Sequence, residues 1–315
     1  MPFLDSRFHG NDDKRDAIHC FSTLPTKGMQ RRTLMIQSFK KRFPFRLGTT
    51  SYILPADLIT NARFLASLVD DIELVLFEAD DVSNLPDAGT ITELQDIARC
   101  HDLTYTVHLP LGLSLGSADE KKRRSSVNQA LRLVELTAPL NPIAYILHFE
   151  GERRGSAPSE NMSGWIKGLR VSVGDLLNQG NAPSLFCVET LDYPFALVDP
   201  ILSEFGLSVC LDVGHTLLGG YPLDAYLAKY HDRIRVLHAH GIRENKDHRN
   251  LGALKDPELA LLFGNLRAWV FSPPVLTLEV FNEEDFRLSL DVVEKWASPP
   301  PNPTPPGGGG GLFFI

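Results

Sequence analysis

Short apolar runs alternate with longer amphipathic stretches between residues 45 and 297. The runs are rich in β-branched and aromatic residues, which predicts strands, and the stretches repeat apolar residues at helical spacing. Eight strands are expected, at residues 45–51, 72–78, 103–109, 144–150, 185–190, 207–213, 234–240 and 275–281. A helix is expected after each strand, at residues 55–69, 92–101, 119–137, 159–177, 195–205, 223–230, 257–270 and 283–296.

The expected strands are continuously apolar rather than alternating, which indicates a parallel sheet buried on both faces by helices. Eight such βα units close into an α/β fold of the (β/α)₈ or TIM barrel type. The alternative is an open doubly wound sheet, but that fold carries a glycine-rich phosphate turn after an early strand. The turn after Leu47 reads GTTSYILP and has one glycine, so the barrel is favoured.

The two ends of the chain lack this pattern. Residues 1–44 are polar and aperiodic and have no long apolar segment of a secretory signal, so we expect a disordered or spurious extension. Its opening resembles peptides translated from bacterial interspersed repeats, which predicts a start at Met29 or Met35 and discounts His9 and His19 as ligands. Residues 298–315 are rich in proline and glycine and are expected to form a disordered tail. The barrel domain is therefore expected at residues 45–297.

Composition narrows the possible partners. The net charge of −8 disfavours nucleic acid, because a nucleic-acid-binding protein needs a positive field to neutralise phosphates. No apolar run reaches the length of a membrane span, so no membrane partner is expected. The cysteines form no CxxC pair, and Cys187 and Cys210 stand in expected buried strands, which indicates a reducing, cytoplasmic setting.

Ionisable side chains stand at the ends of most expected strands, where the chemistry of such barrels gathers. They are Glu78, His108, His148, Glu189, Asp212, His215, His238, His240 and Glu279, followed by Asp247 and His248 in the loop KDHRNLG. For any one of them, a hydrogen-bonded core residue or an Arg–Glu pair is the common explanation. For the whole set, like charges would share one barrel mouth at a cost of several kcal/mol. Divalent metal ions remove this conflict, and the ligand types suit Zn²⁺, Mn²⁺, Fe²⁺ or Co²⁺.

The order of these motifs carries a resemblance to a known family. The motifs are HLP at His108, HFEG at His148, ETLD at Glu189, DVGH at Asp212, HAHG at His238, DHRNLG at Asp247 and EVF at Glu279. Together they resemble the xylose-isomerase-like barrel superfamily over residues 45–297. This superfamily includes sugar isomerases and epimerases as well as apurinic endonucleases of the endonuclease IV type.

The resemblance implies two different ligand sets. Isomerases and epimerases typically hold one metal through the positions of Glu189, Asp212, His238 and Glu279, and the two glutamates also move a proton. This chain has four further histidines that match the additional ligands of the endonuclease-like sites, namely His108, His148, His215 and His248. Extra metals favour hydrolysis, because several cations together activate water and clamp a phosphodiester.

One position departs from the endonuclease pattern. An Asp stands there two residues before the last histidine, whereas this chain has Lys246 at that position and Asp247 directly before His248. Two or three divalent metals are therefore expected, and Asp247 either ligates or orients His248. His238 is preferred over His240 as the ligand because it completes the order of the family pattern.

The stretches at residues 48–87 and 103–117, together with SVCLDVGHTLLGG, resemble cobamide-remodelling phosphodiesterases of this superfamily. That resemblance implies hydrolysis of the phosphodiester in the nucleotide loop of a corrinoid, with Glu189 and Glu279 taking up the proton. The alternatives are a sugar or sugar-phosphate isomerase or epimerase with one metal, an endonuclease IV-like enzyme, and a non-catalytic corrinoid- or metal-binding module. Candidate contacts to the substrate are Glu78, Arg153, Arg154, His240 and Asp247.

Overall fold

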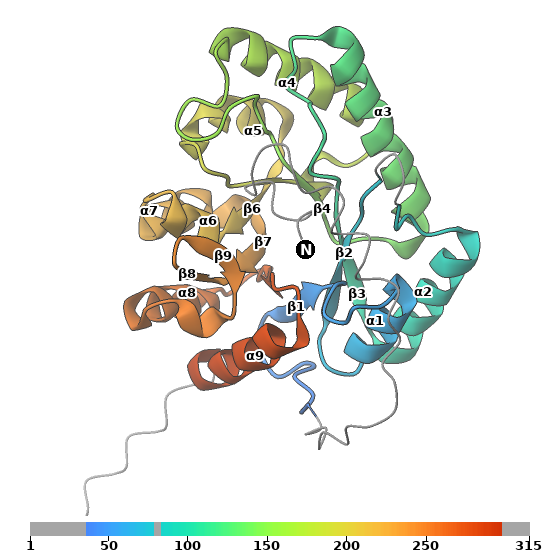
Figure 1. The fold of residues 1–315 in the computed structure, drawn as a ribbon, viewed down its shortest axis with the longest axis vertical. Coiled ribbons are helices and arrows are strands. Elements are labelled where there is room, and N and C mark those ends of the chain that lie inside the picture. Colours follow the sequence, from blue (N-terminus) through green and yellow to red (C-terminus); the bar gives the residue numbers. More distant parts are fainter. Residues whose placement is uncertain (1–35, 79–82, 298–315) are drawn as a thin grey trace, which may run out of the picture.

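Eight parallel strands close into a barrel at the centre of the molecule, and helices surround it (Figure 1). The computed structural model describes residues 36–78 and 83–297. The barrel strands are β1 (Arg46–Thr50), β2 (Asp71–Val75), β3 (Thr104–His108), β4 (Tyr145–Leu147), β5 (Phe186–Glu189), β6 (Ser208–Asp212), β7 (Ile234–Ala239) and β10 (Val275–Leu278). The helices are α1 (Leu58–Leu65), α2 (Ala88–His101), α3 (Glu120–Thr137), α4 (Met162–Leu177), α5 (Asp199–Phe205), α6 (Val213–Leu218), α7 (Leu223–Tyr230), α8 (Asp256–Ala268) and α9 (Glu283–Ala297).

Each barrel strand pairs in parallel with its neighbours in chain order, and β1 pairs with β10 to close the barrel. This arrangement confirms the predicted α/β barrel, and all eight predicted strands are present among the described residues. The strands form where the apolar runs were found, because a strand buried on both sides needs apolar residues at successive positions.

Aspartates cap the first three outer helices. Asp57, Asp87 and Asp119 each accept a hydrogen bond from a backbone N–H group in the first turn of α1, α2 and α3. Such caps satisfy N–H groups that have no partner inside the helix. The cap at Asp87 starts α2 four residues before the position that the apolar pattern alone predicts.

The core has two parts. The larger part lies between the barrel and the helices and includes Leu47, Leu211, Leu237 and Leu276. The smaller part is a separate group of fully buried side chains inside the barrel, formed by Ala144, Ile146, Cys187, Cys210 and Val236. Because residues two apart on a strand point to the same side, this inner group lies directly below the strand ends on β5, β6 and β7.

A small antiparallel hairpin follows β7 and was not predicted. It consists of β8 (Gly241–Arg243) and β9 (Lys246–Arg249), and Figure 1 shows it beside the end of β7. Its turn residues, Glu244 and Asn245, both have positive φ, as a tight hairpin turn requires. The hairpin folds the DHR segment back toward the barrel mouth.

Residues 36–44 pack against the barrel although the sequence pattern assigns them to the N-terminal extension. Phe39 is buried, and its backbone N–H donates to the carbonyl of Leu68. The packed domain therefore begins before residue 45. Residues 1–35 and the predicted tail at residues 298–315 lie outside the described residues.

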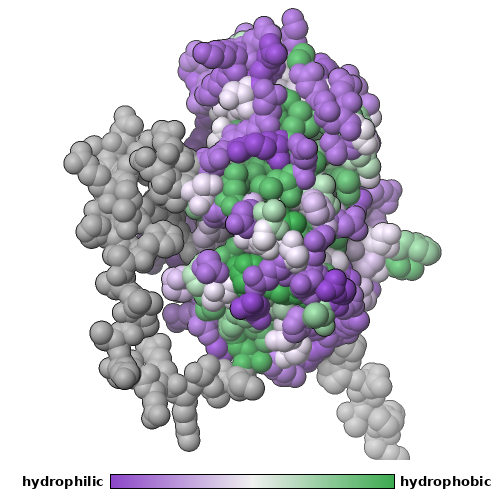
Figure 2. Space-filling view, turned by 90° about the vertical axis from the view of Figure 1, so that its right-hand side faces the viewer, coloured by the Kyte–Doolittle hydropathy of each residue, from purple (hydrophilic) through white to green (hydrophobic). Residues whose placement is uncertain are grey.

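The surface carries few large apolar side chains. In the view of Figure 2, hydrophilic residues cover much of the face and apolar residues lie between them. The most exposed large apolar side chains are Val270 and Phe271, in the connection from α8 to β10. No helix in the described part of the chain is long and apolar enough to cross a membrane. Cys187 and Cys210 are buried free thiols, as predicted, and Cys100 is exposed.

Candidate metal centre

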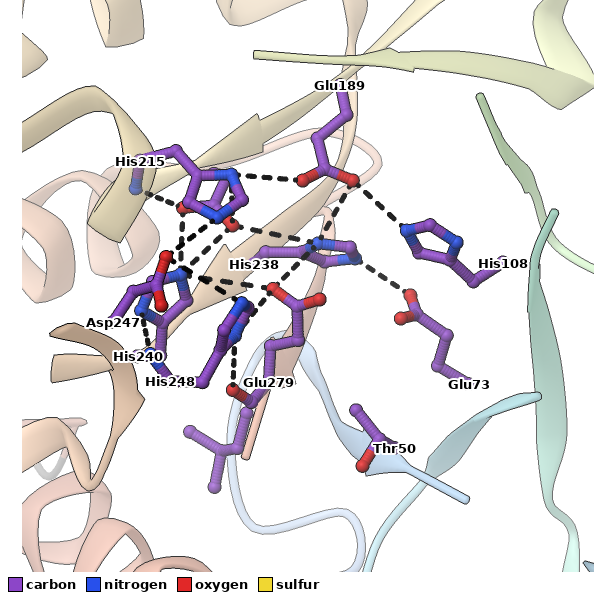
Figure 3. Close-up of polar contacts among 12 residues, drawn as sticks. Thr50, Glu73, His108, Glu189, His215, His238, His240, Asp247, His248 and Glu279 are labelled. Atoms are coloured by element: carbon purple, nitrogen blue, oxygen red, sulfur yellow. Dashed lines mark hydrogen bonds and ion pairs between the residues drawn. The ribbon is translucent and has the colours of Figure 1, made fainter. Parts of the chain in front are cut away.

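Ionisable side chains meet at the carboxyl ends of the barrel strands (Figure 3). On β5 and β6 they follow the buried thiols of the inner core by two residues, so Glu189 and Asp212 point to the same side as Cys187 and Cys210. Both carboxylates have no exposed surface. The strand pattern that fills the barrel with apolar groups therefore also directs the carboxylates toward its mouth.

Glu189 lies between two groups of histidines. Its Oε2 atom lies 3.0 Å from His148 Nε2 and 3.3 Å from His108 Nε2. Its Oε1 atom lies 3.3 Å from His215 Nδ1 on the other side. One carboxylate thus presents its two oxygens to separate sets of potential ligands.

A second group consists of Glu189, Asp212, His238 and Glu279. One potential ligand atom from each of these four buried residues lies within 4.8 Å of the others. His238 Nδ1 lies 3.3 Å from Glu279 Oε2 and 3.5 Å from Glu189 Oε2. Glu189 therefore belongs both to this group and to the group with His108 and His148.

A third group includes His248 from the hairpin. His215, His240 and His248 bring one ring nitrogen each within 4.8 Å of one another. Asp247 Oδ2 lies 3.5 Å from His215 Nε2 and 3.9 Å from His248 Nε2. His248 has a φ of 50°, a left-handed conformation that is uncommon for non-glycine residues.

The glycine of the DVGH motif is required by packing. A Cβ atom at Gly214 would lie 2.0 Å from His240 Cε1, so a side chain there would displace the imidazole. Asp212 also caps α6 by accepting a hydrogen bond from the His215 backbone N–H at 2.6 Å. The motif thus holds the carboxylate and both imidazoles in one compact unit.

Opposite charges balance within the centre. Burial lowers the pKa of His148, but the carboxylates of Glu189 and Glu150 outweigh it and raise the pKa to about 10. Burial disfavours the ionised form of Asp212, yet His215 and His240 hold the pKa of this carboxyl well below its usual range. Burial raises the pKa of Glu279. A proton on His148 thus offsets carboxylate charge, and a bound cation would replace that proton.

The residues present fit a group of divalent cations. Buried atoms that face the centre have no hydrogen-bond partner among the described residues, namely Glu189 Oε1, both ring nitrogens of His215, His238 Nδ1 and Glu279 Oε2. Buried polar atoms without partners are costly, so their convergence at one place points to an absent ligand. Imidazole and carboxylate donors suit Zn²⁺, Mn²⁺, Fe²⁺ and Co²⁺.

The structure brings the eight predicted metal ligands together at the barrel mouth. They are His108, His148, Glu189, Asp212, His215, His238, His248 and Glu279. Among the other predicted residues, His240 and Asp247 also lie there.

Glu78 was predicted to end the second strand and to bind substrate, and this prediction is wrong in its placement. Strand β2 ends three residues earlier, at Val75, and the Glu78 carboxylate instead forms an ion pair with Arg132 on α3. Glu78 does not line the cavity described below. The apolar run extends beyond the strand, so its charged end does not mark the end of β2.

Two carboxylates that the sequence analysis did not select lie against the predicted ligands. Glu73 Oε2 on β2 lies 2.8 Å from His238 Nε2, and both residues are fully buried. Glu150 Oε1 lies 3.2 Å from His148 Nδ1. A carboxylate inside an apolar strand is the signal that could have revealed Glu73.

A cavity of about 440 Å³ opens beside the centre. Its walls include His108, His148, Glu189, His215, His248 and Glu279 on one side and residues 150–154 and 191–193 on the other. Arg153 pairs with Glu160, whereas no ion pair is found for Arg154 within the described part of the chain. A second cavity of about 360 Å³ adjoins the first and shares Leu111, Glu150, Gly151 and Glu152 with it.

Comparison with known proteins identifies the family. The model of the xylose isomerase-like TIM barrel family matches residues 63–298, so this chain belongs to that family. A search of curated protein sequences found no match.

Solved structures share the fold at low sequence identity. A D-tagatose 3-epimerase-like protein has a TM-score of 0.61 at 16% identity, covering 80% of this chain and 97% of its own. The 3-keto-D-glucoside 4-epimerase YcjR from E. coli has a TM-score of 0.60 at 15% identity, covering 80% and 98%. Endonuclease IV from Thermus thermophilus has a TM-score of 0.59 at 16% identity, covering 79% and 99%. These likenesses establish the fold and leave the reaction open.

Proposed function

We propose that this protein is a metal-dependent phosphodiesterase that hydrolyses the nucleotide-loop phosphodiester of a cobamide. The position of Glu189 carries the first part of this proposal. Its Oε2 atom faces His108, His148 and His238 at 3.0 to 3.5 Å, and its Oε1 atom faces His215 at 3.3 Å. A carboxylate so placed is suited to bridge two cations, and centres with two or more cations are typical of phosphodiester hydrolysis.

The number of ligands favours hydrolysis over isomerisation. A single metal needs only Glu189, Asp212, His238 and Glu279, which form one compact group. Four further histidines would then have no role in the chemistry, although three of them have less than a tenth of their side-chain surface exposed and the fourth has 11%. Burying them beside carboxylates is reasonable if they hold additional cations.

The chain's own groups have distinct roles in this account. His108 and His148 would hold one cation with Glu189, and Asp212, His238 and Glu279 would hold a second. Bound cations of this kind activate water and neutralise the charge on a phosphate. Glu279 Oε2 lies 3.3 Å from His238 Nδ1, and burial raises the pKa of the Glu279 carboxyl, so this group would take up the proton that water releases during hydrolysis.

His215 and His248 complete the mouth with Asp247, whose carboxylate lies within 4 Å of both rings. They hold the third cation if one is present.

The size of the cavity is compatible with a substrate that enters it only in part. A volume of about 440 Å³ is at the small end of the range for ligand cavities. In this proposal the nucleotide loop would enter this space and the corrin ring would remain outside it. Arg154 on the cavity wall is the candidate contact for the phosphate. The choice of a cobamide rests on the sequence resemblance.

Incubation of the metal-loaded protein with an adenosyl-cobamide tests this proposal. We expect a cobinamide-type product by chromatography when Zn²⁺, Mn²⁺, Fe²⁺ or Co²⁺ is supplied. An unchanged cobamide with every one of these metals would contradict it. A DNA duplex with an abasic site serves as the second substrate, and its cleavage in place of the cobamide would assign the endonuclease activity instead.

A sugar or sugar-phosphate epimerase is the second candidate. The group of Glu189, Asp212, His238 and Glu279 supports it, because two glutamates on one metal can remove and return a proton. Exchange of solvent deuterium into a ketose would support this activity. A phosphodiesterase would show no such exchange.

A further inference from the structure

Glu73 and His238 form a buried contact across the barrel interior (Figure 3). Glu73 lies on β2 and His238 on β7, and these strands are not neighbours in the barrel. Glu73 Oε2 lies 2.8 Å from His238 Nε2, and neither side chain is exposed to solvent. Within the described chain, this is the hydrogen bond found for the Glu73 carboxylate, whose other oxygen has no partner.

This contact determines which ring nitrogen of His238 carries a proton. A carboxylate accepts hydrogen bonds, so Nε2 must be the protonated, donating nitrogen. The opposite nitrogen, Nδ1, faces Glu279 at 3.3 Å, Glu189 at 3.5 Å and Asp212 at 3.9 Å. Nδ1 is therefore the atom that His238 offers to a cation.

His240, two residues further along the chain, is also protonated on Nε2, but there this nitrogen contacts a carboxylate of the centre. The backbone N–H of His248 donates to His240 Nδ1 at 3.0 Å, so this nitrogen accepts and carries no proton. A neutral imidazole then has its proton on Nε2, which lies 3.1 Å from Asp212 Oδ1. His240 thus donates to a metal-facing carboxylate instead of binding a cation.

We infer that Glu73 is a positioning residue that selects Nδ1 of His238 as a metal-binding atom, while His240 orients Asp212. Carboxylates commonly hold metal-binding histidines in this way, fixing the tautomer and the ring orientation. The inference distinguishes the two histidines of the LHAH segment by their hydrogen bonds. It rests on the proposed metal centre and is independent of the substrate.

Metal affinity tests the role of Glu73. In Glu73→Ala the imidazole loses its acceptor, and we expect about 10- to 100-fold weaker binding of one Zn²⁺ per chain in competition with a chromophoric chelator. Glu73→Gln keeps a carbonyl oxygen that can accept from Nε2, so its affinity should return toward that of the unchanged protein.

The matched control is Asp71→Asn. Asp71 is on the same strand, is equally buried and points to the same side, but it contacts Thr104 and Thr106 instead of a histidine. We expect unchanged Zn²⁺ affinity in this variant. Equal losses in Asp71→Asn and Glu73→Ala would indicate a general effect of altering β2 and would overturn the inference.

The tautomers are tested directly in the unaltered protein. Zn²⁺-loaded protein with ¹⁵N-labelled histidine should show both His238 and His240 protonated at Nε2. Of the ring nitrogens of these two residues, only Nδ1 of His238 should show a metal-induced shift. Signals are assigned with His238→Asn and His240→Asn. A proton on Nδ1 of His238, or a metal-induced shift on a nitrogen of His240, would overturn the inference even if cobamide hydrolysis were demonstrated.

Discussion

Buried carboxylates at the two ends of the barrel interior differ in their hydrogen bonding. At the base, Asp71 has no exposed surface, and its two oxygens accept hydrogen bonds from Thr104 Oγ1 at 2.6 Å and Thr106 Oγ1 at 2.9 Å. At the mouth, Glu189 and Glu279 each keep one oxygen that has no hydrogen-bond partner among the described residues. The protein satisfies its own carboxylate at the base and leaves atoms at the mouth for a ligand.

An apolar layer separates the two ends. Ile146, Cys187, Cys210 and Val236 fill the interior between them, without exposed surface. The contrast therefore lies within single strands, since β2 carries Asp71 at the base and Glu73 two residues higher, against His238. One buried carboxylate of β2 thus contacts threonine hydroxyls, and the next contacts a histidine of the candidate metal centre.

Replacement of Glu189 should have the largest effect. Glu189→Gln keeps the size of the side chain but removes the charge that faces four histidines. We expect loss of phosphodiesterase activity on the order of a thousand-fold, the scale of removing a group that stabilises transition-state charge. Steady-state kinetics measure it, with Glu152→Gln on the cavity wall as the control. Full turnover by Glu189→Gln would remove this residue from the chemistry.

Replacement of Asp71, the carboxylate at the lower end of the barrel interior, should change the pH dependence of the free energy of unfolding. It should leave metal binding intact. Burial raises the pKa of Asp71 from 3.8 to about 7, so the folded state binds the proton more tightly than the unfolded state. Stability conferred by this proton is complete below about pH 4 and is lost as the pH rises to about 7. The loss is on the order of a few kcal/mol.

The variant Asp71→Asn cannot ionise, so this loss should be absent from it. Urea unfolding at pH 5 and pH 8 measures the difference. We expect the variant to gain stability relative to the unchanged protein on going from pH 5 to pH 8. The same difference between the two proteins at both pH values would show that Asp71 does not titrate in this range.

Adding a methyl group at the barrel mouth should lower the free energy of unfolding more than adding one on an outer helix. Gly214→Ala places a methyl group where His240 now lies, which should cost about 1–3 kcal/mol of unfolding free energy and weaken metal binding. Gly264→Ala in α8 is the control, because nothing lies within 4 Å of its added Cβ. Alanine favours a helix, so this control should be neutral or stabilising. Equal stability of both variants would contradict the close packing of His240.

Replacing either of the two adjacent arginines on the cavity wall should change KM, but by different amounts. Arg153 is held by Glu160, whereas Arg154 lines the cavity without an ion pair in the described chain. We expect Arg154→Ala to raise KM about tenfold, as loss of one charged hydrogen bond would, and Arg153→Ala to have little effect. Equal KM values for the two variants would show that Arg154 does not contact the substrate.

The sequence predicts the barrel and the mouth residues for one physical reason. Parallel strands buried on both sides are apolar throughout, so an ionisable residue that closes such a run marks the end of the strand. This rule finds Glu189 and Asp212, which end β5 and β6. It fails for Glu78, because the apolar run continues for two residues beyond the end of β2.

Other features depend on tertiary contacts that the sequence pattern does not express. The β8–β9 hairpin has no apolar run, and its turn uses Glu244 and Asn245 where glycine would be the usual signal. The roles of His238 and His240 depend on a carboxylate 165 residues away and on a backbone N–H in the hairpin. Such partners can be identified only when the chain is folded.

The metal content of the purified protein tests the central claim most directly. Elemental analysis of the native protein, after removal of loosely bound ions, gives the number of tightly held divalent cations per chain. The bridging position of Glu189 predicts two or three, with loss of more than one in Glu189→Gln. A single tightly held ion, retained when Glu189 is replaced, would contradict a multinuclear centre and favour the epimerase.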